Sequence, residues 1–214
     1  MVQDSLLQRG VYRVTRLLVR CVAVWLFRLR CRGRHQLPSS GGALICSNHQ
    51  SHIDPVVIGM CCDRQLHYLA RKSLFRFAPF AALIRFYGAI SIDRDGVGLT
   101  GIKGILRYLK NDRLVLIFPE GTRSRDGRVA ALKPGLCALA RRAQVPLIPI
   151  ALDGAFEVLP RGRWWPRRTT VRVCFGDPIW PRSMTSFDDE ALLRELRRRI
   201  VDCYAQVRRE RTGT

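Results

Sequence analysis

Apolar residues recur along most of the chain in a pattern typical of alternating strands and helices. Short continuous apolar runs at 43–46 and 114–118 predict buried strands, because parallel strands covered on both faces are apolar throughout. Helical spacing of apolar residues predicts a long closing helix over 188–208, with Leu192 and Leu196 on its inner face. Strands separated by helices favour an α/β fold, a mixed and largely parallel sheet flanked by helices.

The same reading assigns the remaining elements. Further strands are predicted at 66–70, 89–92, 147–152 and 171–175. Further helices are predicted at 10–32, 55–62, 98–110 and 134–143, with helical pieces over 73–86 that are broken near Pro79.

The N-terminal helix at 10–32 is predicted to be amphipathic, with Trp25 on its apolar face and arginines such as Arg16 on another face. That pattern is typical of a helix lying in a membrane surface, although a helix packed on its own domain is the alternative. Its apolar run at 21–27 is too short to span a bilayer, which takes roughly 20 residues. A Pro, Ser and Gly cluster at 35–42 predicts a division into a membrane-associating segment (1–36) and a main domain (37–214).

The charge balance points to an anionic partner. The chain has 37 Lys and Arg residues against 17 Asp and Glu, a formal net charge of +20, so nucleic acid and an anionic membrane both remain open. None of the eight cysteines forms a C-x-x-C pair, and we expect reduced cysteines in a cytosol-facing protein, with no metal site.

A first polar string, 48–55, follows the predicted strand at 43–46 and contains two histidines and an aspartate. His49 is suited to act as a general base, and Asp54 could orient its imidazole and stabilise the imidazolium. Asp54 followed by Pro55 also suits the start of a helix, so a helix-capping role remains open. His52 is the competing candidate for the base.

A second polar string, 118–124, follows the predicted strand at 114–118. Glu120, Gly121, Thr122 and Arg123 combine a carboxylate, a glycine turn, a hydroxyl and a guanidinium, which are the parts of an anion-binding loop. Lys133 can add a further positive charge. Arginine can grip a phosphate with two hydrogen bonds, so this loop is predicted to bind a phosphate.

Together the two strings resemble the main motifs of the glycerolipid acyltransferases, whose His-x4-Asp pattern selects His49 over His52. Residues 88–94 resemble a further block of that family, in which the residue matching Arg94 is implicated in binding the acceptor. Ser91 stands there where a bulky apolar residue is common. Residues 145–150 resemble a fourth block, so the resemblance covers 48–150.

The resemblance implies transfer of a fatty acyl group from acyl-CoA or acyl-carrier protein to 1-acylglycerol-3-phosphate, giving phosphatidic acid in phospholipid biosynthesis. It assigns catalysis to His49 and Asp54, and leaves open another lysolipid acceptor such as lyso-ornithine lipid. No acyl-enzyme intermediate, metal or bound organic cofactor is implied. We expect a peripheral or monotopic protein on the cytoplasmic face of the inner (plasma) membrane.

Two tryptophans lie among arginines at 161–168. Trp164 and Trp165 suit a membrane interface, although tryptophans covering the edge of the core are the alternative. A nucleic-acid-binding protein is disfavoured because no helix-turn-helix, zinc-finger or RNA-binding strand signature is visible. An inactive lipid-binding relative is disfavoured by the intact motifs.

Overall fold

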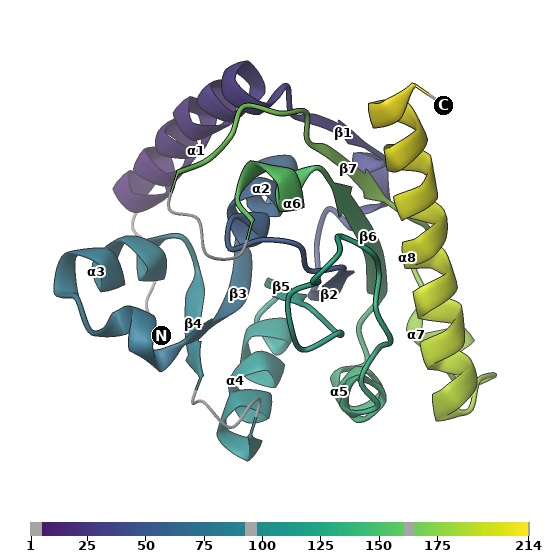
Figure 1. Cartoon of the computed structure of the whole chain (residues 1–214). Helices are drawn as coiled ribbons and strands as arrows, with labels where there is room; N and C mark the ends of the chain where they lie inside the picture. The colour runs from purple at the N-terminus through teal and green to yellow at the C-terminus, as the bar shows by residue number, and fades with distance from the viewer. Residues whose placement is uncertain (1–5, 93–97, 161–164, 214) are drawn as a thin grey trace.

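A seven-stranded, mostly parallel sheet organises the chain in the computed structural model, which describes residues 6–92, 98–160 and 165–213 (Figure 1). The strand order is β1-β7-β6-β2-β5-β3-β4, and only the β6 and β7 pairing is antiparallel. The strands are β1 (Arg30–Arg32), β2 (Ala43–Ser47), β3 (Leu66–Arg71), β4 (Ala89–Ile92), β5 (Leu114–Ile117), β6 (Leu147–Asp153) and β7 (Arg172–Phe175).

Helices connect these strands. The α-helices are α1 (Leu6–Phe27), α2 (Asp54–Cys61), α3 (Ala78–Phe86), α4 (Leu99–Lys110), α5 (Gly135–Ala143), α6 (Ala155–Val158), α7 (Pro181–Met184) and α8 (Asp189–Thr212). Two 3-10 turns, η1 (Arg34–Gln36) and η2 (Lys72–Phe75), complete the described elements.

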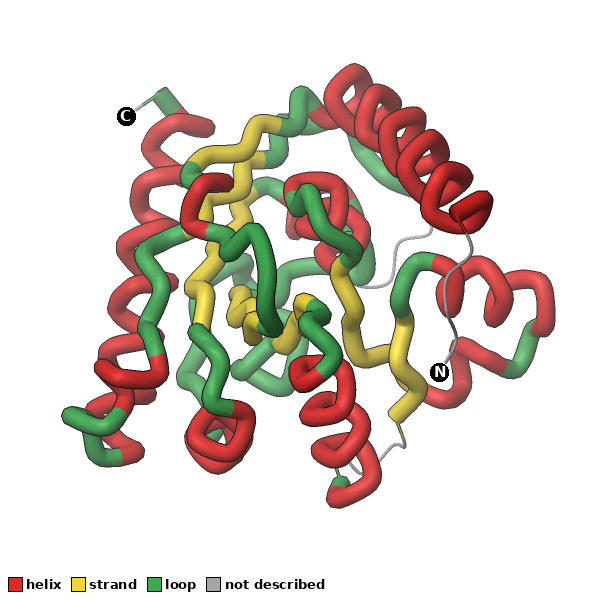
Figure 2. Tube along the Cα trace, turned by 180° about the vertical axis from the view of Figure 1, so that it is seen from behind, coloured by secondary structure: helices red, strands yellow, loops and turns green. Residues whose placement is uncertain are grey.

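Each face of the sheet has its own apolar core, because successive side chains of a strand point to opposite faces. Leu44 of β2 lies in the core that includes residues of α4, α5 and α8, whereas Ile45 lies in the core that includes residues of α1, α2 and α6. Figures 1 and 2 show these two sets of helices on opposite sides of the sheet. The predicted mixed α/β fold is therefore confirmed.

One predicted helix was too long. The helix expected over 10–32 ends at Phe27, and Arg30–Arg32 form an edge strand parallel to β7. Arg28 has a left-handed backbone conformation (φ 45°), which ends the helix, and the backbone N–H of Arg30 then donates to Val171. The division of the chain after residue 36 stays a prediction; strand β1, which precedes it, belongs to the sheet.

The predicted break near Pro79 lies slightly earlier. Turn η2 ends at Phe75 and α3 begins at Ala78, with Pro79 in the first turn of α3. Proline is accepted there because the first N–H groups of a helix have no partner within it. The other predicted strands and helices are confirmed, with ends that move by a few residues.

Both polar strings leave the sheet at the same edge. Strands β2 and β5 are parallel neighbours, and Cys46 lies opposite Ile117 near their carboxyl ends. His49 and Phe118 therefore follow adjacent strand ends, the place where ligands collect in parallel α/β sheets.

Candidate active site

A histidine and a buried aspartate form the centre of the site. His49 Nδ1 lies 2.7 Å from Asp54 Oδ2, a hydrogen-bonding distance. The Asp54 side chain is fully buried, whereas 19% of the His49 side chain is exposed. In the tautomer that carries its proton on Nδ1, His49 donates this hydrogen bond to Asp54, and the lone pair of Nε2 is available to a substrate.

The Asp54 carboxylate does not cap helix α2, which corrects the capping alternative. Ile53 occupies the N-cap position, and Asp54 is the first helical residue. Its Oδ2 instead accepts the backbone N–H groups of Gln50 (2.6 Å) and Ser51 (2.8 Å), in addition to His49. Three donors thus converge on one carboxylate oxygen and fix its position.

Burial raises the pKa of Asp54 above its usual range. The hydrogen bond and charge of His49 and the backbone N–H groups of Ser51 and Gln50 act in the opposite direction, because they favour the carboxylate. The local donors therefore offset only part of the cost of burying this carboxylate beneath the imidazole.

Phe118 supports the imidazole from the neighbouring strand end. The two rings are stacked, with centroids 3.8 Å apart and planes inclined by 14°. Together, this stacking and the Asp54 hydrogen bond restrict the rotation of His49. Phe118 was noted in the sequence only as the end of a strand; its position directly after β5 was the available signal.

Glu120 joins the second string to the first. Its Oε1 accepts the backbone N–H of His49 at 3.2 Å, and the backbone N–H of Ser124 donates to the His49 carbonyl at 2.7 Å. Glu120 is buried, and this burial raises its pKa to about 7. The backbone N–H groups of His49 and Ala130 partly oppose this rise.

The loop after Glu120 has the conformation that its glycine allows. Gly121 has φ 71°, and a Cβ there would lie 2.6 Å from Lys133 Cε, so the lysine side chain passes close to the glycine backbone. The backbone N–H of Lys133 donates to the Pro119 carbonyl at 2.8 Å. Thr122 is exposed and Arg123 is half-buried. Arg94 lies outside the described residues.

Two amides that the sequence did not single out hold the His49 loop from the other side. Asn48 Nδ2 donates to the Leu152 carbonyl (3.0 Å), and Asn48 Oδ1 accepts the Leu152 N–H (2.9 Å). Gln50 Nε2 donates to the Gly127 carbonyl at 2.7 Å. Both amides flank the histidine in sequence, but their partners are distant in the chain and had no sequence signal.

The site therefore offers a base with a fixed ring, next to a loop with cationic side chains. The family model described as Acyltransferase matches residues 28–153, more than half of the chain and all of this site up to the end of β6. The chain belongs to the acyltransferase family.

Named relatives and a solved structure agree with this membership. A 1-acyl-sn-glycerol-3-phosphate acyltransferase of Bacillus subtilis is 28% identical over 68% of this chain and 71% of its own length. A chloroplastic 1-acyl-sn-glycerol-3-phosphate acyltransferase of Brassica napus is 27% identical over 77% of this chain, which spans only 49% of that relative.

The fold is also that of a solved acyltransferase. The crystal structure of the 1-acyl-sn-glycerophosphate acyltransferase PlsC from Thermotoga maritima superposes with a TM-score of 0.80 and 21% identity. The match covers 95% of this chain and 82% of that one. The sheet and its flanking helices are therefore the architecture of a known acyltransferase.

Proposed function

We propose that the protein transfers a fatty acyl group from acyl-CoA or acyl-carrier protein to the free hydroxyl of 1-acylglycerol-3-phosphate, giving phosphatidic acid for phospholipid biosynthesis. The observation that carries the proposal is the 2.7 Å contact of His49 Nδ1 with the buried Asp54, next to the Glu120–Arg123 loop. The relatives from Bacillus subtilis and Brassica napus are 1-acyl-sn-glycerol-3-phosphate acyltransferases, which supports the choice of acceptor.

The chemistry needs one base and no enzyme nucleophile. His49 Nε2 takes the proton of the acceptor hydroxyl as its oxygen attacks the thioester carbonyl carbon. The tetrahedral intermediate then collapses, the carbon–sulfur bond breaks, and the leaving thiolate receives the proton from His49. Asp54 holds the ring tautomer and stabilises the imidazolium between the two steps.

The acceptor phosphate is assigned to the loop that follows β5. Arg123 can bind phosphate oxygens bidentately, and Lys133 supplies a further positive charge beside Gly121. Thr122 can donate its hydroxyl, and Arg94 remains assigned to the acceptor on the family resemblance. Glu120, being buried against the His49 backbone, contributes to substrate binding by positioning this loop.

A peripheral or monotopic contact with the cytoplasmic face of the inner membrane is proposed for helices α1 and α3. Several large apolar side chains of both helices are exposed to solvent, including Leu18 (61%) and Trp25 (70%) on α1 and Leu83 (52%) on α3. Ring contacts of Tyr12 with Phe86 and Tyr87 join α1 to the end of α3. None of the helices in the described part of the chain has the length and apolar character that crossing a bilayer requires.

Acceptor choice tests the proposal. Purified protein in anionic mixed micelles receives acyl-CoA or acyl-carrier protein together with lysophosphatidic acid, monoacylglycerol or lyso-ornithine lipid, and products are detected by mass. We expect diacyl product with lysophosphatidic acid and little with monoacylglycerol, which lacks the phosphate. Product with lyso-ornithine lipid alone would replace the acceptor and contradict the proposal.

A lysine variant tests the phosphate assignment. Lys133→Met is expected to raise the KM for lysophosphatidic acid roughly 10-fold or more, because a charge-assisted hydrogen bond contributes about 1.5–3 kcal/mol. Lys110→Met, the same change at an exposed residue of α4, is the control and should leave KM unchanged. Equal KM values for the two variants would remove Lys133 from the phosphate site.

A further inference from the structure

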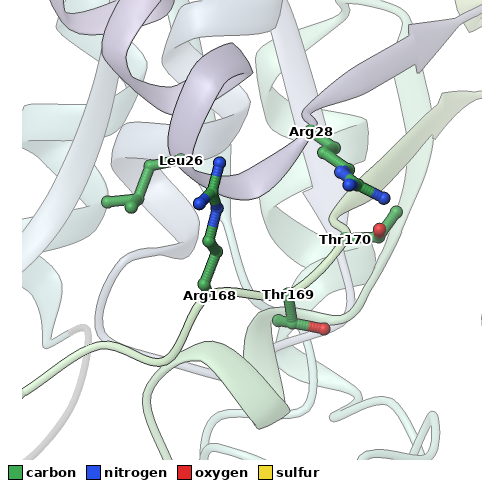
Figure 3. Close-up of a pocket in the computed structure, with 5 residues that line it drawn as sticks. All are labelled: Leu26, Arg28, Arg168, Thr169 and Thr170. Carbon is green, nitrogen blue, oxygen red and sulfur yellow. The ribbon is translucent and has the colours of Figure 1, made fainter.

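A cavity with two arginines lies where helix α1 ends, away from the loop assigned to the acceptor. It has a volume of about 280 Å³ and is lined by Leu26, Arg28, Arg168, Thr169 and Thr170. Figure 3 shows the Arg28 side chain extending toward Thr170, while the Arg168 guanidinium extends toward α1 and Leu26. The lining thus comes from two segments, the end of α1 and the stretch that leads into β7.

The polar lining of the cavity consists of groups that can donate hydrogen bonds to an anion. Two guanidinium groups and two hydroxyls face one space, and none of the described lining residues carries a carboxylate. Within the described ranges, none of these four side chains has a hydrogen bond or ion pair. The Arg168 guanidinium lies over the Trp25 ring, 5.0 Å from its centroid. Both arginines are exposed residues, so an oxyanion would replace solvent as the acceptor of their hydrogen bonds.

The backbone around the cavity is held in place by interactions between the two segments. The N–H of Val171 donates to the Phe27 carbonyl at 2.9 Å, and Arg172 Nη1 donates to the Arg28 carbonyl at 2.9 Å. Arg28 itself has φ 45°, a conformation that glycine adopts at lower cost. An arginine at this position presents its side chain to the cavity despite that cost.

We propose that this cavity binds the phosphate of an anionic membrane phospholipid. Trp25, which contacts Arg168, is 70% exposed, and Trp165 of the adjoining segment is 84% exposed. Tryptophans exposed beside arginines match the headgroup level of a bilayer, where lipid phosphates lie. The inference rests on the proposed membrane contact of α1.

The cavity is distant from the proposed acceptor site, but it lies at the same edge of the sheet as His49. Strand β7 is three strands from β5 in the sheet, which corresponds to roughly 14 Å at about 4.8 Å per step. Because β7 is antiparallel to β6, its start lies at the carboxyl edge of the parallel strands, the edge from which His49 projects. A lipid bound in the cavity would hold this edge against the bilayer.

Vesicle partitioning of purified variants tests the proposal. Vesicles of phosphatidylcholine with about 30 mol% phosphatidylglycerol, which have an anionic surface, are compared with vesicles of pure phosphatidylcholine. The variants are Arg28→Gln with Arg168→Gln, and Thr169→Val with Thr170→Val, which removes two hydroxyls at constant charge. Arg142→Gln with Arg182→Gln, at exposed residues of α5 and α7, is the matched charge control, and Thr185→Val is the control for the hydroxyls. Unchanged thermal unfolding midpoints establish that each variant is folded.

The two sets of variants separate a binding site from general electrostatic attraction. We expect the arginine pair to lower partitioning to anionic vesicles by about 20-fold or more, since each basic residue near such a surface contributes about fivefold through charge alone. We expect the threonine pair to lower it about threefold or more, and both controls less than twofold. Equal losses of vesicle partitioning for the two arginine pairs, or no loss for the threonine pair, would contradict a lipid-binding site in this cavity.

Competition identifies the source of the phosphate. Inorganic phosphate and coenzyme A are added at constant ionic strength, and neither is expected to displace the protein from anionic vesicles at millimolar concentration. Displacement of wild type but not of the arginine pair would overturn the lipid as the ligand and assign the cavity to a soluble phosphate. A wild-type protein that binds neither vesicle would overturn the membrane contact as well, whereas wild-type binding with unaffected variants would overturn this inference alone.

Discussion

The carboxylate of Glu120 accepts the backbone N–H of His49 at 3.2 Å, across the ends of two adjacent strands. The carbonyl of the same histidine accepts the N–H of Ser124 at 2.7 Å. The loop assigned to phosphate binding therefore holds the backbone of the residue assigned as the base. The groups proposed to bind the acceptor and the group proposed to deprotonate it are thereby positioned relative to each other, as transfer between two bound substrates requires.

Glu120 predicts a pH dependence of stability. Its pKa is raised by burial from 4.5 to about 7, so between these values the unfolded chain releases the proton while the folded protein keeps it. The free energy of unfolding should therefore fall as pH rises from about 4.5 to about 7, by roughly 1–3 kcal/mol from this group. Glu120→Gln lacks this titration, so urea unfolding at pH 5 and pH 8 should show a smaller decrease than in wild type. An identical decrease in both proteins would contradict the burial of an ionisable group here.

Asp54 is predicted to act through its charge. Asp54→Asn keeps an oxygen that can accept the three hydrogen bonds now made to Oδ2, but it cannot stabilise an imidazolium by charge. We expect kcat to fall about 10²- to 10⁴-fold with little change in KM. Asp63→Asn, at an exposed surface aspartate, is the control and should retain wild-type kcat. A kcat above about one hundredth of the wild-type value in the folded Asp54→Asn protein, the low end of that range, would show that Asp54 is only structural.

Phe118 is predicted to act on the orientation of His49. Phe118→Leu removes the stacked ring at 3.8 Å while keeping an apolar side chain. Because an aromatic pair contributes about 0.5–1.5 kcal/mol, kcat should fall about 3- to 10-fold. Phe187→Leu makes the same change in the core on the opposite face of the sheet and should affect stability rather than kcat. Steady-state kinetics that give equal kcat values for the two variants would be inconsistent with this role.

Gly121 is predicted to be needed for its backbone conformation and for the nearby lysine. In Gly121→Ala, a residue with a Cβ must adopt φ 71°, which costs about 1–2 kcal/mol, and the Lys133 side chain must move away. We expect lower thermal stability and a several-fold higher KM for lysophosphatidic acid. Gly135→Ala, where an added Cβ meets nothing within 4 Å, is the control. An unchanged KM together with a lowered melting temperature would show that the backbone conformation of Gly121 matters for stability and not for acceptor binding.

Sequence patterns were sufficient to predict the strands and helices that are apolar throughout or have a regular spacing of apolar residues. Strands such as β5 and helices such as α8 contain continuous or helix-spaced apolar residues, and both were predicted. Strand β1 was missed because it is three residues long, polar, and at an edge of the sheet. Its strand conformation depends on hydrogen bonds to β7, more than 130 residues away, and not on local preference.

The same difference applies to the site. The sequence placed His49 and Asp54 together because they are five positions apart and a known family pattern contains both. It could not give the direction of the Asp54 carboxylate, which turns back to Gln50 and Ser51 where a helix cap was an alternative. Nor could it find the ring of Phe118 against His49, since that contact depends on the pairing of β2 with β5.

Acyl transfer measured for wild type and His49→Ala side by side tests the central claim most directly. Both proteins receive acyl-CoA and lysophosphatidic acid in anionic mixed micelles, and the phosphatidic acid formed is quantified by mass. Wild type should form phosphatidic acid, and His49→Ala should form it about 10²- to 10⁴-fold more slowly while unfolding at a similar temperature. Formation of phosphatidic acid by folded His49→Ala at the wild-type rate would contradict the assignment of His49 as the base.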